Sequence, residues 1–137
     1  MAWKLTSPEL SENDVERQCL AICERRNYWH ARLHAGRFWT WDKKRVITGL
    51  PKGTPDYALQ HSYYPGFLLE VKRPGGVTSP DQDCRRFQIV AQYQLAICVV
   101  DNDREFVEWL DRHERYAREM WGRLLAGVPI VPPARGP

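Results

Sequence analysis

Two stretches of this chain of 137 residues are the most informative about its fold: Gly53-Thr54-Pro55-Asp56 and Phe67-Leu68-Leu69-Glu70-Val71-Lys72. The first ends a turn-prone segment on an acid. The second is an apolar run that carries a carboxylate and an amine. Because side chains on a β-strand alternate between two faces, Glu70 and Lys72 share one face while their apolar neighbours occupy the other. The two stretches therefore predict two acids and a lysine at one end of a sheet.

Turn and cap signals place further elements around these stretches. Strands are predicted at 56–61 and 67–72, and the short connection between them makes the two strands antiparallel neighbours. Ser79, Pro80 and Gln82 form the start of a helix over 80–93. Residues 95–100 form a continuous apolar run, which predicts a strand parallel to 67–72, reached through a crossover helix. Burial on both faces predicts that this run is a central strand.

The outer parts of the chain are also patterned. Ser11 with Asp14 resembles a capping box and opens a helix to about residue 26. Residues 28–33 predict a short strand, and the turn-prone, basic segment 36–53 predicts a hairpin or a long loop. Residues 103–126 predict a long amphipathic helix. Its apolar side comprises Phe106, Leu110, His113, Ala117, Trp121 and Leu124.

Composition limits the class of protein. With 43% hydrophobic and 27% charged residues, the chain is expected to form one domain over 1–126, followed by a proline-rich tail over 127–137. No apolar stretch reaches the length of a membrane span and no secretory signal is present, so a cytoplasmic protein without a membrane partner is expected. The formal charge of +3 permits a polyanionic partner without requiring one.

The cysteines and histidines give no metal motif. Cys19, Cys23, Cys84 and Cys98 form no CxxC pair and lie in apolar contexts, which predicts reduced thiols in the core. Cys19 and Cys23 are four residues apart on a predicted helix, a spacing that allows zinc binding, but no His or Cys pair at ligand spacing accompanies them. The four histidines are scattered and are interpreted as structural or surface residues.

The order helix, strand, hairpin, helix, strand, with Pro-Asp on one hairpin strand and Glu-x-Lys on the next, resembles the PD-(D/E)xK nuclease superfamily. More narrowly, the chain resembles the VRR-NUC family of virus-type replication and repair nucleases over about residues 11–112. Four motifs carry this resemblance, at 11–15, 53–56, 70–72 and 76–82. The resemblance implies an α/β fold with a restriction-endonuclease-like αβββαβ core, in which helices flank a mixed sheet. An extra C-terminal helix follows that core.

The resemblance also implies a DNA endonuclease that depends on Mg²⁺ or Mn²⁺ and uses no small-molecule cofactor. A phosphodiester is a poor electrophile, and a bound divalent ion both neutralises its charge and acidifies a water molecule. Asp56 and Glu70 are suitable oxygen donors. As in the family, the carbonyl of Val71 is a further donor. Lys72 is expected to hydrogen-bond the attacking water or to stabilise charge in the transition state.

Glu12 is the fourth acid of the expected site, with Glu16 as the alternative. If Glu12 is set at zero on a helical wheel, Cys19 and Cys23 lie about 20° to either side and Glu16 about 40° away. Glu12 is thus predicted near the centre of the buried stripe, and the family motif also falls on it, implying a metal-binding role. As a simpler interpretation, Glu12 is a first-turn acid favoured by the helix dipole. Gln82 is expected to orient water or contact DNA, although its capping role explains it equally well.

DNA is the expected partner. Basic side chains that suit phosphates are Arg32, Lys43, Lys44, Arg45, Lys52, Arg73, Arg85 and Arg86. Trp39 and Trp41 either stack on bases or pack a hairpin against the sheet. Family members of this size are often phage-encoded and act on branched DNA in repair, with Holliday-junction resolution as one possibility. Resolution requires two sites, so it predicts a homodimer.

Two other classes of function stay open from the sequence. One is a module that binds nucleic acid without cutting it, in which Glu70 and Lys72 form an ordinary ion pair on a strand. The other is a nuclease subunit whose specificity comes from a partner protein. Neither is excluded, because recognition of nucleic-acid shape leaves no readable base-contact code in a sequence.

Overall fold

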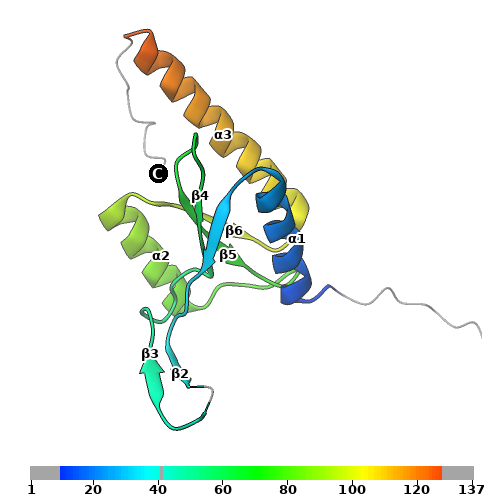
Figure 1. Ribbon diagram of the computed structural model, residues 1–137, viewed down its shortest axis with the longest axis vertical. Coiled ribbons are helices and arrows are strands. Elements are labelled where there is room, and N and C mark those ends of the chain that lie inside the picture. Colours follow the sequence, from blue (N-terminus) through cyan, green and yellow to red (C-terminus); the bar gives the residue numbers. More distant parts are fainter. Residues whose placement is uncertain (1–9, 41, 128–137) are drawn as a thin grey trace, which may run out of the picture.

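The computed structural model describes residues 10–40 and 42–127 of the chain. Trp41 and residues 128–137 of the proline-rich tail lie outside the described residues. The helices and strands are, in chain order, α1 (Glu12–Arg25), β1 (Trp29–Arg32), β2 (Arg37–Trp39), β3 (Val46–Thr48), β4 (Tyr57–Gln60), β5 (Phe67–Val71), α2 (Pro80–Tyr93), β6 (Ala96–Val100) and α3 (Asp103–Leu125) (Figure 1). Both predicted capping boxes are present: Ser11 with Asp14 opens α1, and Ser79 with Gln82 opens α2.

Four strands form a mixed sheet in the order β1-β4-β5-β6. β4 pairs antiparallel with β1 and with β5, while β5 and β6 are parallel. The α/β class and both predicted pairings of β5 are thereby confirmed. The central position expected for residues 95–100 is wrong, because β6 lies at an edge of the sheet. The apolar residues of β6 are explained by the helices that pack on its two faces, and not by neighbouring strands on both of its edges.

The helices form a layer on each face of the sheet. α1 and α3 pack against each other on one face, and α2 covers the other face beside β6 (Figure 1). The main core lies under α1 and α3. Its buried residues are Val15, Cys19, Ile22, Cys23, Tyr28, Tyr57, Leu59, Phe67, Leu69, Val71, Cys98, Val100, Phe106 and Leu110. The face of β5 turned toward α2 is therefore left to Leu68 and Glu70.

Only the first part of the predicted apolar side of α3 is buried. Phe106, Leu110 and Ala117 are buried, whereas Trp121 and Leu124 are about half exposed. The reason is geometric, because α3 continues past the end of the sheet (Figure 1). No helix in the described part of the chain is long and apolar enough to cross a membrane.

The basic segment forms a hairpin, one of the two structures expected for it. Within residues 10–40 and 42–127, β2 and β3 pair only with each other, in a two-stranded antiparallel sheet. The hairpin projects from the body of the protein (Figure 1).

Three of the four cysteines are buried thiols, as predicted. Burial raises the pKa of Cys19 and of Cys23 to about 12, and it raises that of Cys98 as well. Cys84 contradicts the prediction, because it lies on the exposed side of α2. All four are free thiols.

Candidate active site

The site lies where β4 begins and β5 ends. Asp56 immediately precedes β4, and the antiparallel register carries it to the end of β5. There the backbone N–H of Val71 donates a hydrogen bond to Oδ2 of Asp56 at 2.9 Å. The Gly-x-Pro turn thus ends on a carboxylate that is held against the neighbouring strand.

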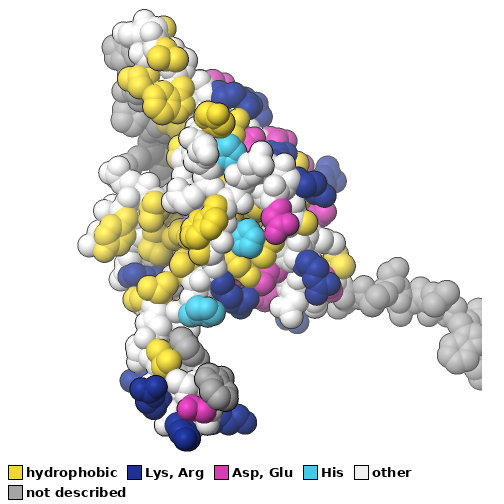
Figure 2. Space-filling view, viewed as in Figure 1, with side chains coloured by type: hydrophobic (Ala, Val, Ile, Leu, Met, Phe, Trp, Pro, Cys, Tyr) yellow, Lys and Arg dark blue, Asp and Glu magenta, His cyan; other side chains and the backbone are white. Residues whose placement is uncertain are grey.

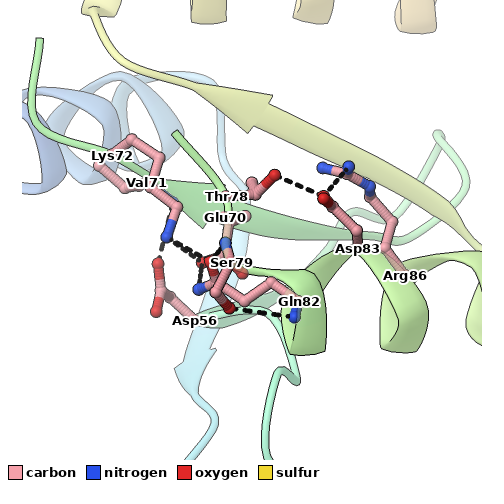
Figure 3. A network of polar contacts seen from close by, with 9 residues as sticks. All are labelled: Asp56, Glu70, Val71, Lys72, Thr78, Ser79, Gln82, Asp83 and Arg86. Atoms are coloured by element: carbon pink, nitrogen blue, oxygen red, sulfur yellow. Dashed lines mark hydrogen bonds and ion pairs between the residues drawn. The ribbon is translucent and has the colours of Figure 1, made fainter. Parts of the chain in front are cut away.

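Glu70, Lys72 and Gln82 bond to one another in a closed triangle (Figure 3). Nζ of Lys72 lies 3.2 Å from Oε1 of Glu70 and donates to Oε1 of Gln82 at 2.7 Å. Nε2 of Gln82 donates to Oε1 of Glu70 at 2.7 Å. The pairing of Glu70 with Lys72 on one face of β5 was predicted from strand alternation. The bonds to Gln82 were not predicted, because they depend on where α2 packs.

The capping role expected for Gln82 is confirmed. Oε1 of Gln82 accepts from the backbone N–H of Ser79 at 2.9 Å, and the N–H of Gln82 donates to Oγ of Ser79 at 3.2 Å. This reciprocal cap holds the amide at the start of α2. The cap therefore aims the Gln82 amide at Glu70 and Lys72.

The loop before Asp56 packs directly on the start of α2. Gly53 has a φ of +87°, and a Cβ on it would lie 2.4 Å from the carbonyl oxygen of Asp81. Lys52 forms an ion pair with the same residue, since its Nζ lies 3.1 Å from Oδ2 of Asp81. Only glycine allows this approach, both for space and for backbone conformation. The turn that carries Asp56 and the helix that carries Gln82 are thus held together.

The carboxylates are destabilised in their charged form. Burial raises the pKa of Glu70 to about 7, with a further upward contribution from the nearby charge of Asp56, while Lys72 acts in the opposite direction. Glu70 is only 4% exposed. Burial also raises the pKa of Asp56, against the lowering effect of the Val71 N–H, and the charge of Glu12 adds to the rise. Two neighbouring acids that resist ionisation are a common feature of catalytic and metal-binding sites.

The donor set can be tested against the expected ion. The described residues contain no cluster of three or more His, Cys, Asp or Glu side chains with metal-binding geometry. Mg²⁺ does not need such a cluster, since it is usually held by one or two carboxylates and keeps several waters. A divalent cation would also offset the repulsion between Asp56 and Glu70. These two residues therefore fit Mg²⁺, with the Val71 carbonyl as the further donor that the resemblance implies.

Glu12 and Glu16 differ in their hydrogen-bond partners. The carboxylate of Glu16 accepts from Nη1 of Arg32 at 3.2 Å and from the hydroxyl of Tyr57. Glu12 makes no hydrogen bond or ion pair with any described residue. Its charge raises the pKa of both Asp56 and Glu70, while the charge of Glu16 also raises the pKa of Asp56, by less. The predicted burial of Glu12 is wrong, because it lies exposed in the first turn of α1. Of the two acids, Glu12 is the one left available to the site.

The basic residues singled out in the sequence fall into two groups. Lys43, Lys44 and Arg45 lie between β2 and β3 at the tip of the hairpin, where Figure 2 shows basic side chains gathered. The others belong to the body of the protein. Arg32 bonds Glu16, Lys52 pairs with Asp81, Arg85 donates to Gln88, Arg86 pairs with Asp83, and Arg73 is exposed one residue beyond Lys72.

Comparison with known proteins found no match to a protein-family model, to a curated protein or to a solved structure. The functional interpretation of the site therefore depends on its residues and their geometry.

Proposed function

We propose that the protein is a metal-dependent endonuclease that hydrolyses phosphodiester bonds in DNA. In this proposal the mixed sheet and its flanking helices are the restriction-endonuclease-like core of the VRR-NUC family, within the PD-(D/E)xK superfamily. The observation that carries it is the pair of neighbouring acids, Asp56 and Glu70, with raised pKa values beside Lys72. An ordinary ion pair on a strand accounts for Glu70 and Lys72, but it gives no reason for a second acid at the same place.

Each residue has a role in the proposed reaction. Asp56 and Glu70, with the Val71 carbonyl, would hold a Mg²⁺ or Mn²⁺ ion, and Glu12 lies exposed nearby as an additional acid. When bound, such an ion supplies positive charge beside the phosphate and lowers the pKa of a water molecule. Lys72 hydrogen-bonds the attacking water or the negative charge that develops on the phosphate. Gln82 holds the Lys72 amine and the Glu70 carboxylate in position through one hydrogen bond to each.

Cleavage of labelled DNA tests this proposal. Duplex, single-stranded and four-way-junction DNA are each incubated with Mg²⁺, Mn²⁺ or EDTA. Wild type is compared with Asp56→Asn and Lys72→Ala, and with Glu119→Gln as a control in an exposed acid of α3. We expect cleavage that requires the metal and is lost in the two site variants alone. Cleavage that continues in EDTA, or equally in all variants, would overturn the proposal.

Branched DNA and a homodimer are the finer part of the proposal. A junction resolvase cuts two strands symmetrically and needs two sites, which a single domain obtains by pairing with a second copy. The exposed Trp121 and Leu124 on the free end of α3 offer apolar surface for such a contact. Size-exclusion chromatography with light scattering should give the molar mass of a dimer. A strict monomer, also in the presence of junction DNA, would exclude symmetric resolution and leave simple strand cleavage.

A non-cleaving nucleic-acid module is the second candidate. It is favoured by the contacts that Lys72 already makes with Glu70 and Gln82, which would equally serve to close the end of the sheet. In that case DNA binding would be indifferent to divalent ions and no product would form. Tight binding without cutting under any metal condition would select this candidate.

A further inference from the structure

The hairpin formed by β2, β3 and the residues between them, referred to here as the basic arm (residues 37–48), carries the net positive charge of the protein. It contains four basic residues and one acid, a formal charge of +3, which equals the charge of the whole chain. The rest of the protein is therefore balanced. Figure 2 shows the basic side chains gathered at the far end of the arm. Its cations are Arg37, Lys43, Lys44 and Arg45.

These cations are exposed. None of the four takes part in an ion pair with any described residue. The one acid of the arm, Asp42, is used differently. Its Oδ1 accepts the backbone N–H of Lys44 at 3.1 Å and the hydroxyl of Thr40 at 2.5 Å. These two bonds lower the pKa of Asp42.

The tip of the arm has a defined shape. The N–H of Thr40 donates to the carbonyl of Arg45 at 2.9 Å, and the N–H of Lys43 donates to the carbonyl of Thr40 at 2.8 Å. Lys43 adopts a left-handed conformation with φ of 59°. The tip therefore presents three successive cations on a closed turn rather than on an extended loop.

The arm is rooted at the candidate active site. A series of backbone hydrogen bonds leads outward from it: the N–H of Leu33 donates to the carbonyl of Asp56 at 2.7 Å, and the N–H of Leu50 donates to the carbonyl of His34 at 2.7 Å. The N–H of Gly36 then donates to the carbonyl of Leu50 at 2.8 Å. The backbone at Asp56 is thus the base from which the arm extends.

We infer that the basic arm binds the phosphate backbone of duplex DNA at a distance from the bond that is cut. This inference rests on the proposed function and adds a requirement for duplex length. From Leu33 to Thr40 the chain makes seven steps, which span at most about 23 Å at the rise of a β-strand. With phosphates about 3.4 Å apart along each strand, that reach corresponds to about seven base pairs. A duplex that extends about seven base pairs on the side of the arm is therefore long enough to contact the site and the tip together, whereas a duplex that ends at the site is not.

Duplex DNA is favoured over a protein partner by the kind of charge on the arm. Exposed lysine and arginine side chains on a narrow two-stranded ribbon suit a regular array of phosphates. Ribbons of this width also fit the major groove. The exposed Trp39, which pairs across the ribbon with Val46, adds an aromatic surface beside the cations.

The test compares an arm variant with a control of equal charge. The arm variant is Lys43→Gln/Lys44→Gln/Arg45→Gln, which leaves the backbone bonds of the tip in place. The control is Arg112→Gln/Arg115→Gln/Arg123→Gln, which removes three exposed charges from α3. Binding is measured by fluorescence anisotropy in EDTA, with labelled duplexes of 6 to 30 base pairs and at several salt concentrations.

We expect the arm variant to bind long duplexes at least tenfold more weakly than wild type does, and the control less than twofold more weakly. The slope of the logarithm of affinity against the logarithm of salt concentration should fall by about two to three, since each lost phosphate contact removes about 0.9. On the shortest duplexes the arm variant and wild type should bind alike. Equal losses in the two variants, or a loss that does not depend on duplex length, would overturn the inference.

This measurement is independent of the proposed reaction, because no metal and no cleavage are involved. A protein that never cuts DNA but shows the length-dependent loss would contradict the proposed function and support the arm. A protein that cuts DNA equally well with and without the three tip cations, on duplexes of every length, would support the proposed function and contradict the arm.

Discussion

Gly53 lies against the backbone of Asp81 so closely that a Cβ atom would be 2.4 Å from the Asp81 carbonyl oxygen. This contact joins the turn that ends on Asp56 to the first turn of α2. The helix in turn delivers Gln82 to Glu70 and Lys72. The turn before Asp56 and the start of α2 can thus pack this closely because Gly53 has no side chain.

Replacing Gly53 should therefore disturb the site as well as the local backbone. We expect Gly53→Ala to lower cleavage by tenfold or more, because the start of α2 must shift away from Glu70. The matched control is Gly127→Ala, since Gly127 also has a positive φ but meets nothing within 4 Å. The control should cost about 1 kcal/mol of stability and leave cleavage unchanged. Equal activity of the two variants would show that the contact with Asp81 is dispensable.

The buried carboxyl of Glu70 should make the metal-free protein less stable as the pH rises. Its pKa is 4.5 ordinarily and about 7 in the folded protein, so between these values the folded state keeps a proton that the unfolded state has lost. The contribution of Glu70 to the free energy of unfolding is therefore greatest below about pH 4.5. It falls by up to about 3 kcal/mol as the pH rises through 7. Urea unfolding at pH 5 and pH 8 measures this loss.

Glu70→Gln should remove most of that pH dependence and be the more stable protein at pH 8, since the amide has no charge to bury. Glu119→Gln, in an exposed acid, should behave like wild type. An unchanged slope of stability with pH in Glu70→Gln would mean that another group causes it.

Divalent metal should reverse this destabilisation. At pH 8 we expect Mg²⁺ to raise the Tm in a concentration-dependent manner, because an ion bound to the folded state alone stabilises it by mass action. The rise should be smaller at pH 5, where Glu70 holds a proton that competes with the metal. It should disappear in Asp56→Asn and in Glu70→Gln. A shift in both variants equal to that of wild type would place the ion elsewhere.

Lys72 should influence both the rate of cleavage and its pH profile. Lys72→Ala is expected to reduce kcat by about a hundredfold or more, because a charged donor is lost next to the reacting phosphate. Lys72 also lowers the pKa of Glu70, so its removal should move the acidic limb of the pH–rate profile to higher pH. Lys72→Arg retains the charge and should keep the limb near its original place. A rate loss without any shift of the limb would argue that Lys72 and Glu70 are not coupled.

Substitutions of Glu12 and Glu16 should have different effects on stability and on Mg²⁺ binding. Glu16→Gln is expected to destabilise the fold by about 1 to 3 kcal/mol, because Arg32 and Tyr57 lose a charged acceptor. Glu12→Gln should leave stability nearly unchanged, since Glu12 is exposed, and should weaken Mg²⁺ binding instead. If Glu16→Gln has the larger effect on Mg²⁺ affinity, the assignment of the fourth acid is reversed.

The local parts of this protein could be read from its sequence. Capping residues determined where α1 and α2 begin, since Ser11 and Ser79 offer oxygens to backbone N–H groups within their own first turns. Strand alternation placed Glu70 and Lys72 on one face of β5. Each of these features depends on residues a few positions apart, so it does not require knowledge of the rest of the chain.

Contacts between distant segments were decided by the tertiary structure alone. The sequence predicted a central strand at 95–100, but burial on both faces by helices produces the same apolar run as pairing on both edges. The helical wheel placed Glu12 in the buried stripe, yet Glu12 lies exposed in the first turn of α1. The bonds of Gln82 to Glu70 and Lys72, and those of Glu16 to Arg32 and Tyr57, depend on the packing of helices against the sheet. A sequence determines periodicity and caps through neighbouring residues, whereas such packing is set by the shapes of surfaces that meet only after the chain has folded.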